Sequence, residues 1–107
     1  MSNNTQDVRL LVLGGEGIGP EVSRAATSVL QTAAEGLGIP LRLDSATIGM
    51  PALHACGTTI PDTIIEQARC ADGVILGPIS HNSYPPVSEG GLNPSGVLRV
   101  KLDLYAN

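Results

Sequence analysis

The chain has 107 residues, of which 42% are hydrophobic and 2% aromatic, and its formal net charge is −4 at pH 7. This length allows one small domain with an aliphatic core. Only 6 residues are Lys or Arg and no apolar run reaches membrane-spanning length, so we expect neither nucleic acid nor a membrane as partner.

The first seven residues, MSNNTQD, are polar and lack the basic and apolar regions of a signal peptide. We therefore expect a cytoplasmic protein in which residues 1–7 form a disordered tail. Cys56 and Cys70 stand far apart and form neither a CxxC pair nor a zinc-ligand spacing. They are expected to be ordinary thiols.

The stretch Val8–Val22, VRLLVLGGEGIGPEV, predicts a buried strand over Val8–Gly14, a glycine turn, and a helix that begins at Pro20. The turn is similar to a phosphate-binding loop. However, the dinucleotide pattern G-x-G-x-x-G, counted from Gly15, meets Pro20 where the third glycine should stand, and a P-loop lysine is absent. An ordinary strand–helix joint is the alternative, and the local chemistry leaves both open.

The next elements alternate between helix and strand. The helix Pro20–Glu35 carries apolar residues at helical spacing, which predicts that one stripe packs on a sheet, and glycines follow it. The stripe consists of Val22, Ala25, Ala26, Val29, Leu30, Ala33, Ala34 and Leu37. Leu41–Ile48 predicts a second strand, on which Asp44 faces solvent.

A short helix is expected over Gly49–Cys56 with Gly57 as its stop. A further helix is expected over Pro61–Arg69, begun by Thr59 or Pro61, with Ile64, Ile65 and Ala68 facing inward. Gly73–Gly77 predicts the third strand. This alternation predicts an α/β fold: a mostly parallel sheet with helices on both faces.

The composition changes after the third strand. Residues 78–94, PISHNSYPPVSEGGLNP, are rich in proline and polar residues and predict a long loop. Loops beyond the carboxyl ends of parallel strands are where α/β folds bind ligands, so we expect a ligand loop here. A last helix is expected from Pro94 or Ser95 to Tyr105, with Val97, Leu98, Leu102 and Tyr105 on one face.

Four stretches in order resemble the isocitrate/isopropylmalate dehydrogenase family, the β-decarboxylating dehydrogenases. These stretches are GGEGIGPEV from Gly14, GTTIP from Gly57, ADGVILG from Ala71 and LRVKLDLYAN from Leu98. The resemblance covers nearly the whole chain but only the N-terminal portion of such an enzyme. It implies an incomplete isopropylmalate dehydrogenase-like fold over residues 1–107.

The resemblance implies NAD- or NADP-dependent oxidative decarboxylation of a malate-type 2-hydroxy acid, such as isocitrate, isopropylmalate or a tartrate-like acid. It also implies Mg²⁺ or Mn²⁺ in the full-length enzyme and a homo-oligomer, at least a dimer. The family's tyrosine–lysine acid/base pair and metal-binding aspartates would lie beyond this chain. We therefore assign no catalytic or metal-binding residue here and expect the truncated chain to be inactive.

The alternative is a stand-alone, non-catalytic α/β module that binds an acidic ligand or a dehydrogenase subunit. By resemblance, Arg99 is the first substrate arginine, a bidentate partner for a carboxylate, and Asn93 and Ser95 are its polar neighbours in the substrate pocket. The residues that the resemblance places beside the nicotinamide cofactor are Ile18, Gly77, Pro78, Ile79, Ser80, Tyr84 and Glu89.

Overall fold

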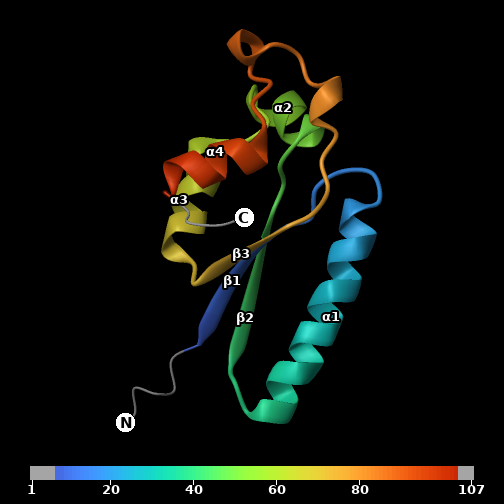
Figure 1. The fold of residues 1–107 in the computed structure, drawn as a ribbon, viewed down its shortest axis with the longest axis vertical. Coiled ribbons are helices and arrows are strands. Elements are labelled where there is room, and N and C mark those ends of the chain that lie inside the picture. Colours follow the sequence, from blue (N-terminus) through green and yellow to red (C-terminus); the bar gives the residue numbers. More distant parts are fainter. Residues whose placement is uncertain (1–6, 104–107) are drawn as a thin grey trace.

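The computed structural model describes residues 7–103 and shows a three-stranded parallel sheet with helices around it (Figure 1). The sheet order is β2-β1-β3, so β1 is central. The elements in chain order are β1 Val8–Leu13, α1 Gly19–Leu37, β2 Leu41–Ala46, α2 Met50–Cys56, α3 Asp62–Cys70, β3 Gly73–Leu76 and α4 Pro94–Lys101. The α/β fold class expected from the sequence is confirmed.

The central strand β1 pairs with both neighbours in parallel, Val8 opposite Leu41 on β2 and Leu10 opposite Gly73 on β3. Leu11, Val12 and Leu13 are all buried, which confirms the prediction of a strand covered on both faces. All three strands point their carboxyl ends toward the same end of the molecule. The glycine turn, α2 and the loop after β3 gather there (Figure 1).

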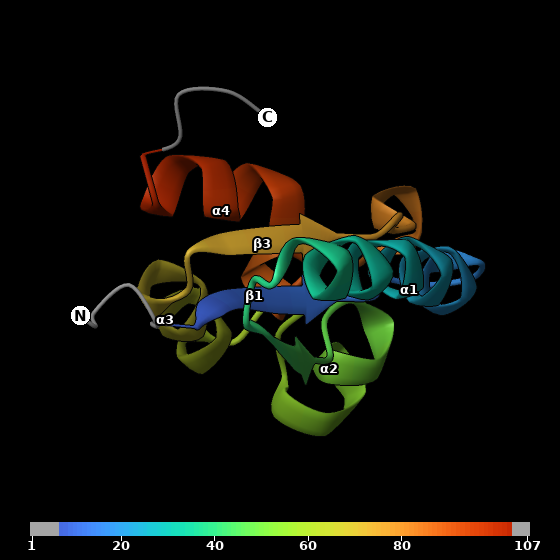
Figure 2. The ribbon, with the colours of Figure 1, turned by 90° about the horizontal axis from the view of Figure 1, so that it is seen from below.

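The helices form two layers on the sheet. Figures 1 and 2 show α1 on one face and α3 and α4 on the other. The main core lies between β1 and the α3–α4 layer. It joins Leu11 and Leu13 to the buried side chains of Ile48, Ile60, Ile64, Ile65, Ala68 and Leu98. The prediction that α3 turns Ile64, Ile65 and Ala68 inward is confirmed.

Helix α1 corrects the sequence prediction. Of the eight residues expected to pack as one stripe, Ala34 alone is buried, whereas Val22, Val29 and Leu37 are 48%, 71% and 74% exposed. Gly19 and Ser23 face inward instead. Gly19 lies directly against the carbonyl of Gly14, and the Ser23 hydroxyl donates to the same carbonyl. Small residues therefore form the face of α1 that meets the end of β1, and most of the apolar stripe lies on other sides of the helix.

Several boundaries also differ. Helix α1 continues two residues past Glu35 to Leu37, and Gly38 closes it in the left-handed conformation with φ 71°. Helix α4 ends at Lys101, and the Tyr105 end predicted for it lies outside the described residues. Thr59 does not cap α3, since Pro61 stands at the N-cap. The expected tail lies outside the described residues up to position 6.

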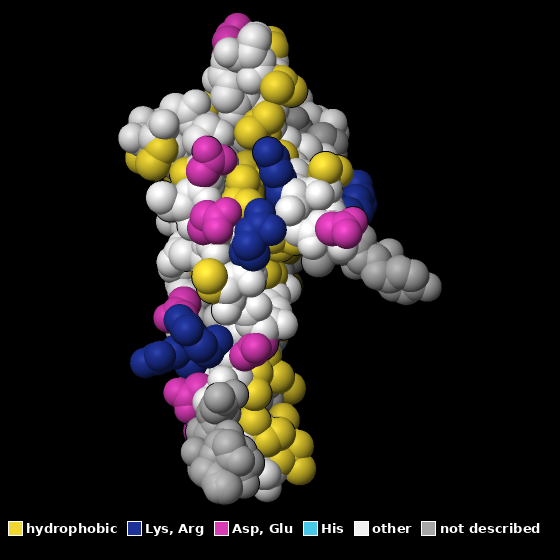
Figure 3. Space-filling model, turned by 90° about the vertical axis from the view of Figure 1, so that its left-hand side faces the viewer, with side chains coloured by type: hydrophobic (Ala, Val, Ile, Leu, Met, Phe, Trp, Pro, Cys, Tyr) yellow, Lys and Arg dark blue, Asp and Glu magenta, His cyan; other side chains and the backbone are white. Residues whose placement is uncertain are grey.

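A groove of about 430 Å³ runs along β3 between α3 and α4. Figure 3 faces this side and shows hydrophobic side chains in a strip flanked by charged ones. Ala68, Val74, Leu98 and Leu102 contribute to its apolar lining. Within residues 7–103, β3 is an edge strand, and no helix is long and apolar enough to cross a membrane. The groove therefore exposes one flank of the core.

We expect the exposed stripe on α1 to make the chain self-associate, because contiguous apolar surface on a helix drives association. Replacing Val22 and Val29 by Gln should shift the chain toward monomer in size-exclusion chromatography. Stability should change by no more than about 0.5 kcal/mol. As control, Ser23→Gln alters the inward face, where Ser23 is 5% exposed, and should lower stability. A monodisperse wild-type monomer would contradict this prediction.

Candidate functional site

The glycine turn between β1 and α1 packs backbone against backbone on the segment that leaves β3. The Glu16 N–H donates to the Pro78 carbonyl over 2.8 Å, and the Gly77 N–H donates to the Leu13 carbonyl over 2.8 Å. A Cβ atom on Gly15 would collide with the Pro78 carbonyl, and one on Gly77 with the Gly14 carbonyl. These glycines therefore allow two chain segments to touch, as in a strand–helix joint.

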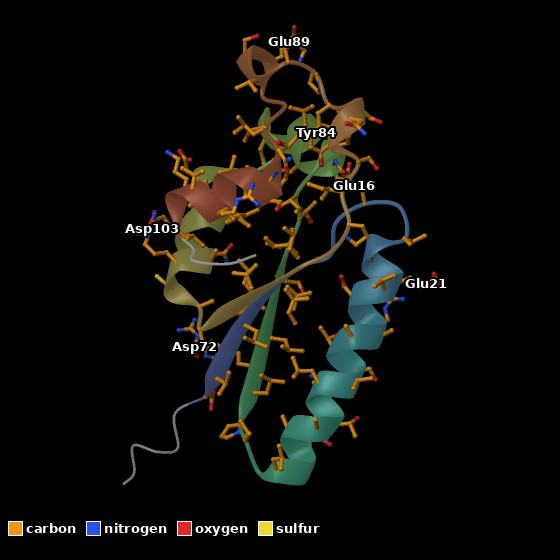
Figure 4. The ribbon with its side chains drawn as sticks, in the orientation of Figure 1. Glu16, Glu21, Asp72, Tyr84, Glu89 and Asp103 are labelled. Carbon is orange, nitrogen blue, oxygen red and sulfur yellow. The ribbon has the colours of Figure 1, made fainter. Side chains whose placement is uncertain are left out.

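The carboxylate of Glu16 is the centre of this site. Its Oε1 accepts hydrogen bonds from the Ser80 N–H over 2.9 Å and from the Tyr84 hydroxyl over 2.6 Å. Its Oε2 accepts from the Met50 N–H over 2.9 Å. One side chain on the glycine turn thus joins two other segments, the start of α2 and the loop after β3. Figure 4 shows Glu16 and Tyr84 directed toward each other.

The backbone at the start of α2 leaves room for this carboxylate. Gly49, the N-cap of α2, has φ 84°, which is left-handed and favours glycine. A Cβ atom at Gly49 would lie 2.6 Å from the Glu16 carboxyl carbon. Glycine at position 49 is therefore required for Glu16 to reach the Met50 N–H, where the negative charge also suits the helix N-terminus.

The hydrogen bonds set the ionisation of the pair. Burial raises the pKa of the Glu16 carboxyl, but the bonds from Ser80, Tyr84 and Met50 outweigh it, and the pKa lies below its ordinary value of 4.5. Burial, together with the bond to Glu16 and its charge, raises the pKa of the Tyr84 phenol well above its ordinary value. At neutral pH, an ionised carboxylate therefore accepts a hydrogen bond from a neutral phenol.

The loop between β3 and α4 (residues 77–93, the β3–α4 loop) is held at both ends. Glu16 and the glycine turn hold its beginning. Thr59, which is fully buried, holds its end: the Thr59 hydroxyl donates to the Leu92 carbonyl, and the Thr59 N–H donates to the Gly90 carbonyl over 3.0 Å. Two 3₁₀ turns, His81–Ser83 and Val87–Glu89, shape the part between. The loop is thus a braced structure on the strand ends.

The residues predicted to face the cofactor occupy different parts of this region. Four of them lie together at one place, where they contact the glycine turn as described above: Gly77, Pro78, Ser80 and Tyr84. Ile18 lies on the turn and is 67% exposed. Two residues depart from this cluster. Ile79 packs against the hydrophobic core, and Glu89 is exposed at the tip of the loop, away from Glu16 (Figure 4).

The three residues predicted to bind substrate belong to α4. Asn93 is its N-cap, and the Asn93 Oδ1 accepts from the Ser95 N–H over 3.1 Å. Ser95 is half-buried beside the groove along β3. Arg99 is exposed in the last turn of the helix. Asn93 therefore has a structural role as the N-cap of α4, which the sequence did not predict.

We tested whether the described residues could hold a divalent metal. Between positions 7 and 103, no group of three or more His, Cys, Asp or Glu side chains is arranged to do so. The carboxylate of Glu16 already accepts three hydrogen bonds from protein donors. This part of the chain therefore does not fit a metal site, and we derive no step through a metal.

Glu16 is not among the site residues predicted from the sequence. The available signal was topological, because the carboxyl ends of neighbouring parallel strands meet at one edge of a sheet. This rule brings the turn after β1 and the loop after β3 together. It does not specify that Glu16 binds Tyr84, since that pairing depends on the 3₁₀ turn at His81–Ser83 and on the left-handed Gly49.

Comparisons with known proteins identify the family of this chain. The family model for isocitrate/isopropylmalate dehydrogenase matches residues 9–107. The chain therefore belongs to this family. It is 36% identical over 101 residues to 3-isopropylmalate dehydrogenase 1 of Bordetella bronchiseptica, and this match covers 92% of the chain and 27% of that protein. It is also 36% identical over 102 residues to the 3-isopropylmalate dehydrogenase of Halalkalibacterium halodurans, covering 28% of it.

Two solved structures share the fold. Isocitrate dehydrogenase from Methylococcus capsulatus matches 92% of this chain and 26% of its own, with a TM-score of 0.70 and 31% identity. The β-decarboxylating dehydrogenase of Thermococcus kodakarensis, in its apo form, matches 91% and 27%, with a TM-score of 0.69 and 29% identity. The chain thus spans about a quarter of the length of these relatives.

The glycine contacts lead to a prediction for stability. Gly15→Ala should lower the free energy of unfolding by about 2 kcal/mol or more, since it combines a positive φ with a collision against the Pro78 carbonyl. Gly36→Ala is the control, because Gly36 lies inside α1 with nothing near its Cβ position, and should stabilise by about 0.5–1 kcal/mol. Urea titration measures both. Equal effects of the two substitutions would refute the close backbone contact.

A second prediction concerns acid. The pKa of the Glu16 carboxyl is lower in the folded chain than in the unfolded chain. The ionised carboxylate therefore contributes its full stabilisation at pH values above the unfolded-state pKa, and this stabilisation is lost as the pH falls through the folded-state pKa. The wild type should therefore be more stable than Glu16→Gln at neutral pH. This advantage should shrink below about pH 4.5. Glu21→Gln, an exposed carboxylate in the first turn of α1, is the control. A difference independent of pH would contradict the ionised pair.

Proposed function

We propose that this chain is the part of an NAD(P)-dependent β-decarboxylating dehydrogenase that carries the nicotinamide-side loop and the first substrate arginine. The family match over residues 9–107 is the observation that supports it. The substrate is a malate-type 2-hydroxy acid, as the names of the relatives, 3-isopropylmalate and isocitrate dehydrogenase, suggest. The cytoplasmic location and the homo-oligomer of at least two subunits, both expected from the sequence, remain predictions.

In this proposal, Arg99 binds a substrate carboxylate. Its guanidinium is exposed on α4 and offers a planar fork of donors that fits a carboxylate through two hydrogen bonds. Asn93 fixes the start of the same helix and so helps to position Arg99. NAD(P), when bound, would supply the hydride acceptor for oxidation of the hydroxyl-bearing carbon of the substrate. The β3–α4 loop would border the nicotinamide.

The remaining catalytic groups would come from the part of the family's sequence that this chain does not match. The described residues show neither a tyrosine–lysine pair in contact nor a grouped set of metal-binding side chains. Joining this chain to the remainder of the Bordetella bronchiseptica relative would provide them. We expect that chimaera to form NAD(P)H with 3-isopropylmalate or isocitrate and Mn²⁺, and the 107-residue chain alone to form none.

Within such a chimaera, Arg99→Ala should lower kcat/KM by about two orders of magnitude, since each hydrogen bond to a charged group contributes roughly 1.5–3 kcal/mol. Arg99→Lys should recover only part, because lysine keeps the charge but not the fork. Affinity for NAD should change little. Lys101→Ala, an exposed cation on the same helix, is the control. Unchanged kcat/KM in Arg99→Ala would remove Arg99 from the substrate site.

A further inference from the structure

We infer that Glu16 is a positioning residue that fixes the beginning of the β3–α4 loop. In this role, the Ser80 N–H and the Tyr84 hydroxyl support the loop through Glu16 and do not donate to the cofactor. This inference rests on the proposed function only where it places the loop beside the nicotinamide. The local geometry stands on its own contacts.

Two hydrogen-bond donors of the loop that lie against the turn are already occupied. The Ser80 N–H and the Tyr84 hydroxyl, the two polar hydrogens that the loop directs toward the turn, both donate to Glu16 Oε1. The hydrogen of a phenol serves one acceptor at a time. A cofactor that took the Tyr84 hydrogen bond would remove a charge-assisted bond from the partly buried Glu16 carboxylate, and this loss would offset the new bond.

The Glu16 carboxylate is itself held in place by groups outside the loop. The Met50 N–H fixes Oε2 from the side of α2, and the Glu16 carbonyl accepts a hydrogen bond from the Gly19 N–H at the start of α1 over 2.8 Å. The carboxylate therefore cannot swing away with the loop. A displacement of Tyr84 would break a charge-assisted bond while the other contacts of Glu16 remain in place.

Glycines make room for the Glu16 side chain and for the close contact beneath it. Gly49 leaves space for the side chain, and Gly15 and Gly77 let the backbones of the turn and the loop meet. Ile18, on the same turn, is 67% exposed and remains available as an apolar contact surface. The turn thus exposes the apolar side chain of Ile18, whereas the carboxylate of Glu16 is bonded to the loop.

The test uses the 107-residue chain with Tyr105→Phe, so that Tyr84 is its only tyrosine. Tyrosinate absorbance then follows Tyr84 alone during alkaline titration. We expect ionisation well above the ordinary tyrosine pKa of about 10, and a value lower by at least about one unit in Glu16→Gln. Glu21→Gln should leave the titration unchanged. The same titration in both Glu16 backgrounds would overturn the inference.

Amide hydrogen exchange, measured near neutral pH, keeps the test informative if the chain unfolds at high pH. In Glu16→Gln, the amides of Ser80 and Met50 should exchange about tenfold faster or more, because each loses an ionised acceptor. The Gly77 amide, bonded to Leu13, should keep its protection. Gly49→Ala, which displaces the carboxylate without altering it, should reproduce the effect on Ser80. Unchanged exchange at Ser80 in both variants would also overturn the inference.

The chimaera separates this inference from the proposed function. If the chimaera is inactive but Glu16→Gln changes both the Tyr84 titration and the Ser80 amide exchange (the two local signals), the proposed function fails and the positioning of the loop by Glu16 stands. In an active chimaera, Glu16→Gln should raise KM for NAD several-fold, with a smaller effect on KM for the hydroxy acid. If KM for NAD is unchanged although the local signals move, Glu16 has no positioning role toward the cofactor.

Discussion

One carboxylate determines how the functional end of this molecule is arranged. Glu16 accepts hydrogen bonds from the start of α2 and from two residues of the β3–α4 loop, so three segments distant in sequence share one charge. Bonds to an ionised acceptor are stronger than neutral ones, and partial burial makes an unmet donor or acceptor costly. The loop, the turn and α2 are therefore expected to move as one unit.

The parallel sheet creates this opportunity. Because β1 and β3 are neighbours and run in the same direction, the turn after one and the loop after the other leave the sheet side by side. The glycines then remove the side chains that would keep the two backbones apart. Thr59 holds the far end of the loop in a similar way, from a buried position between α2 and α3. The loop is thus fixed by side chains of segments that precede it in the chain.

The sequence predicted the architecture well where a local pattern determines it. The unbroken apolar run of β1, the glycine stops after α1 and α2, and the inward face of α3 all follow from neighbouring residues. It was wrong about the stripe on α1, because the small residues Gly19 and Ser23 form the inward face through contacts with Gly14 that lie outside any apolar pattern. It could not predict the pairing of Glu16 with Tyr84, which depends on long-range contacts. The predicted roles of Arg99 and Ile18 remain predictions.

The central claim is that Glu16 and Tyr84 act as a coupled pair that holds the loop to the turn. A double-mutant cycle on the free energy of unfolding, with Glu16→Gln, Tyr84→Phe and the combination, tests it most directly. We predict a coupling energy of about 1.5 kcal/mol or more at neutral pH, in the range of a hydrogen bond to a charged group. Effects that add within about 0.5 kcal/mol would contradict the account.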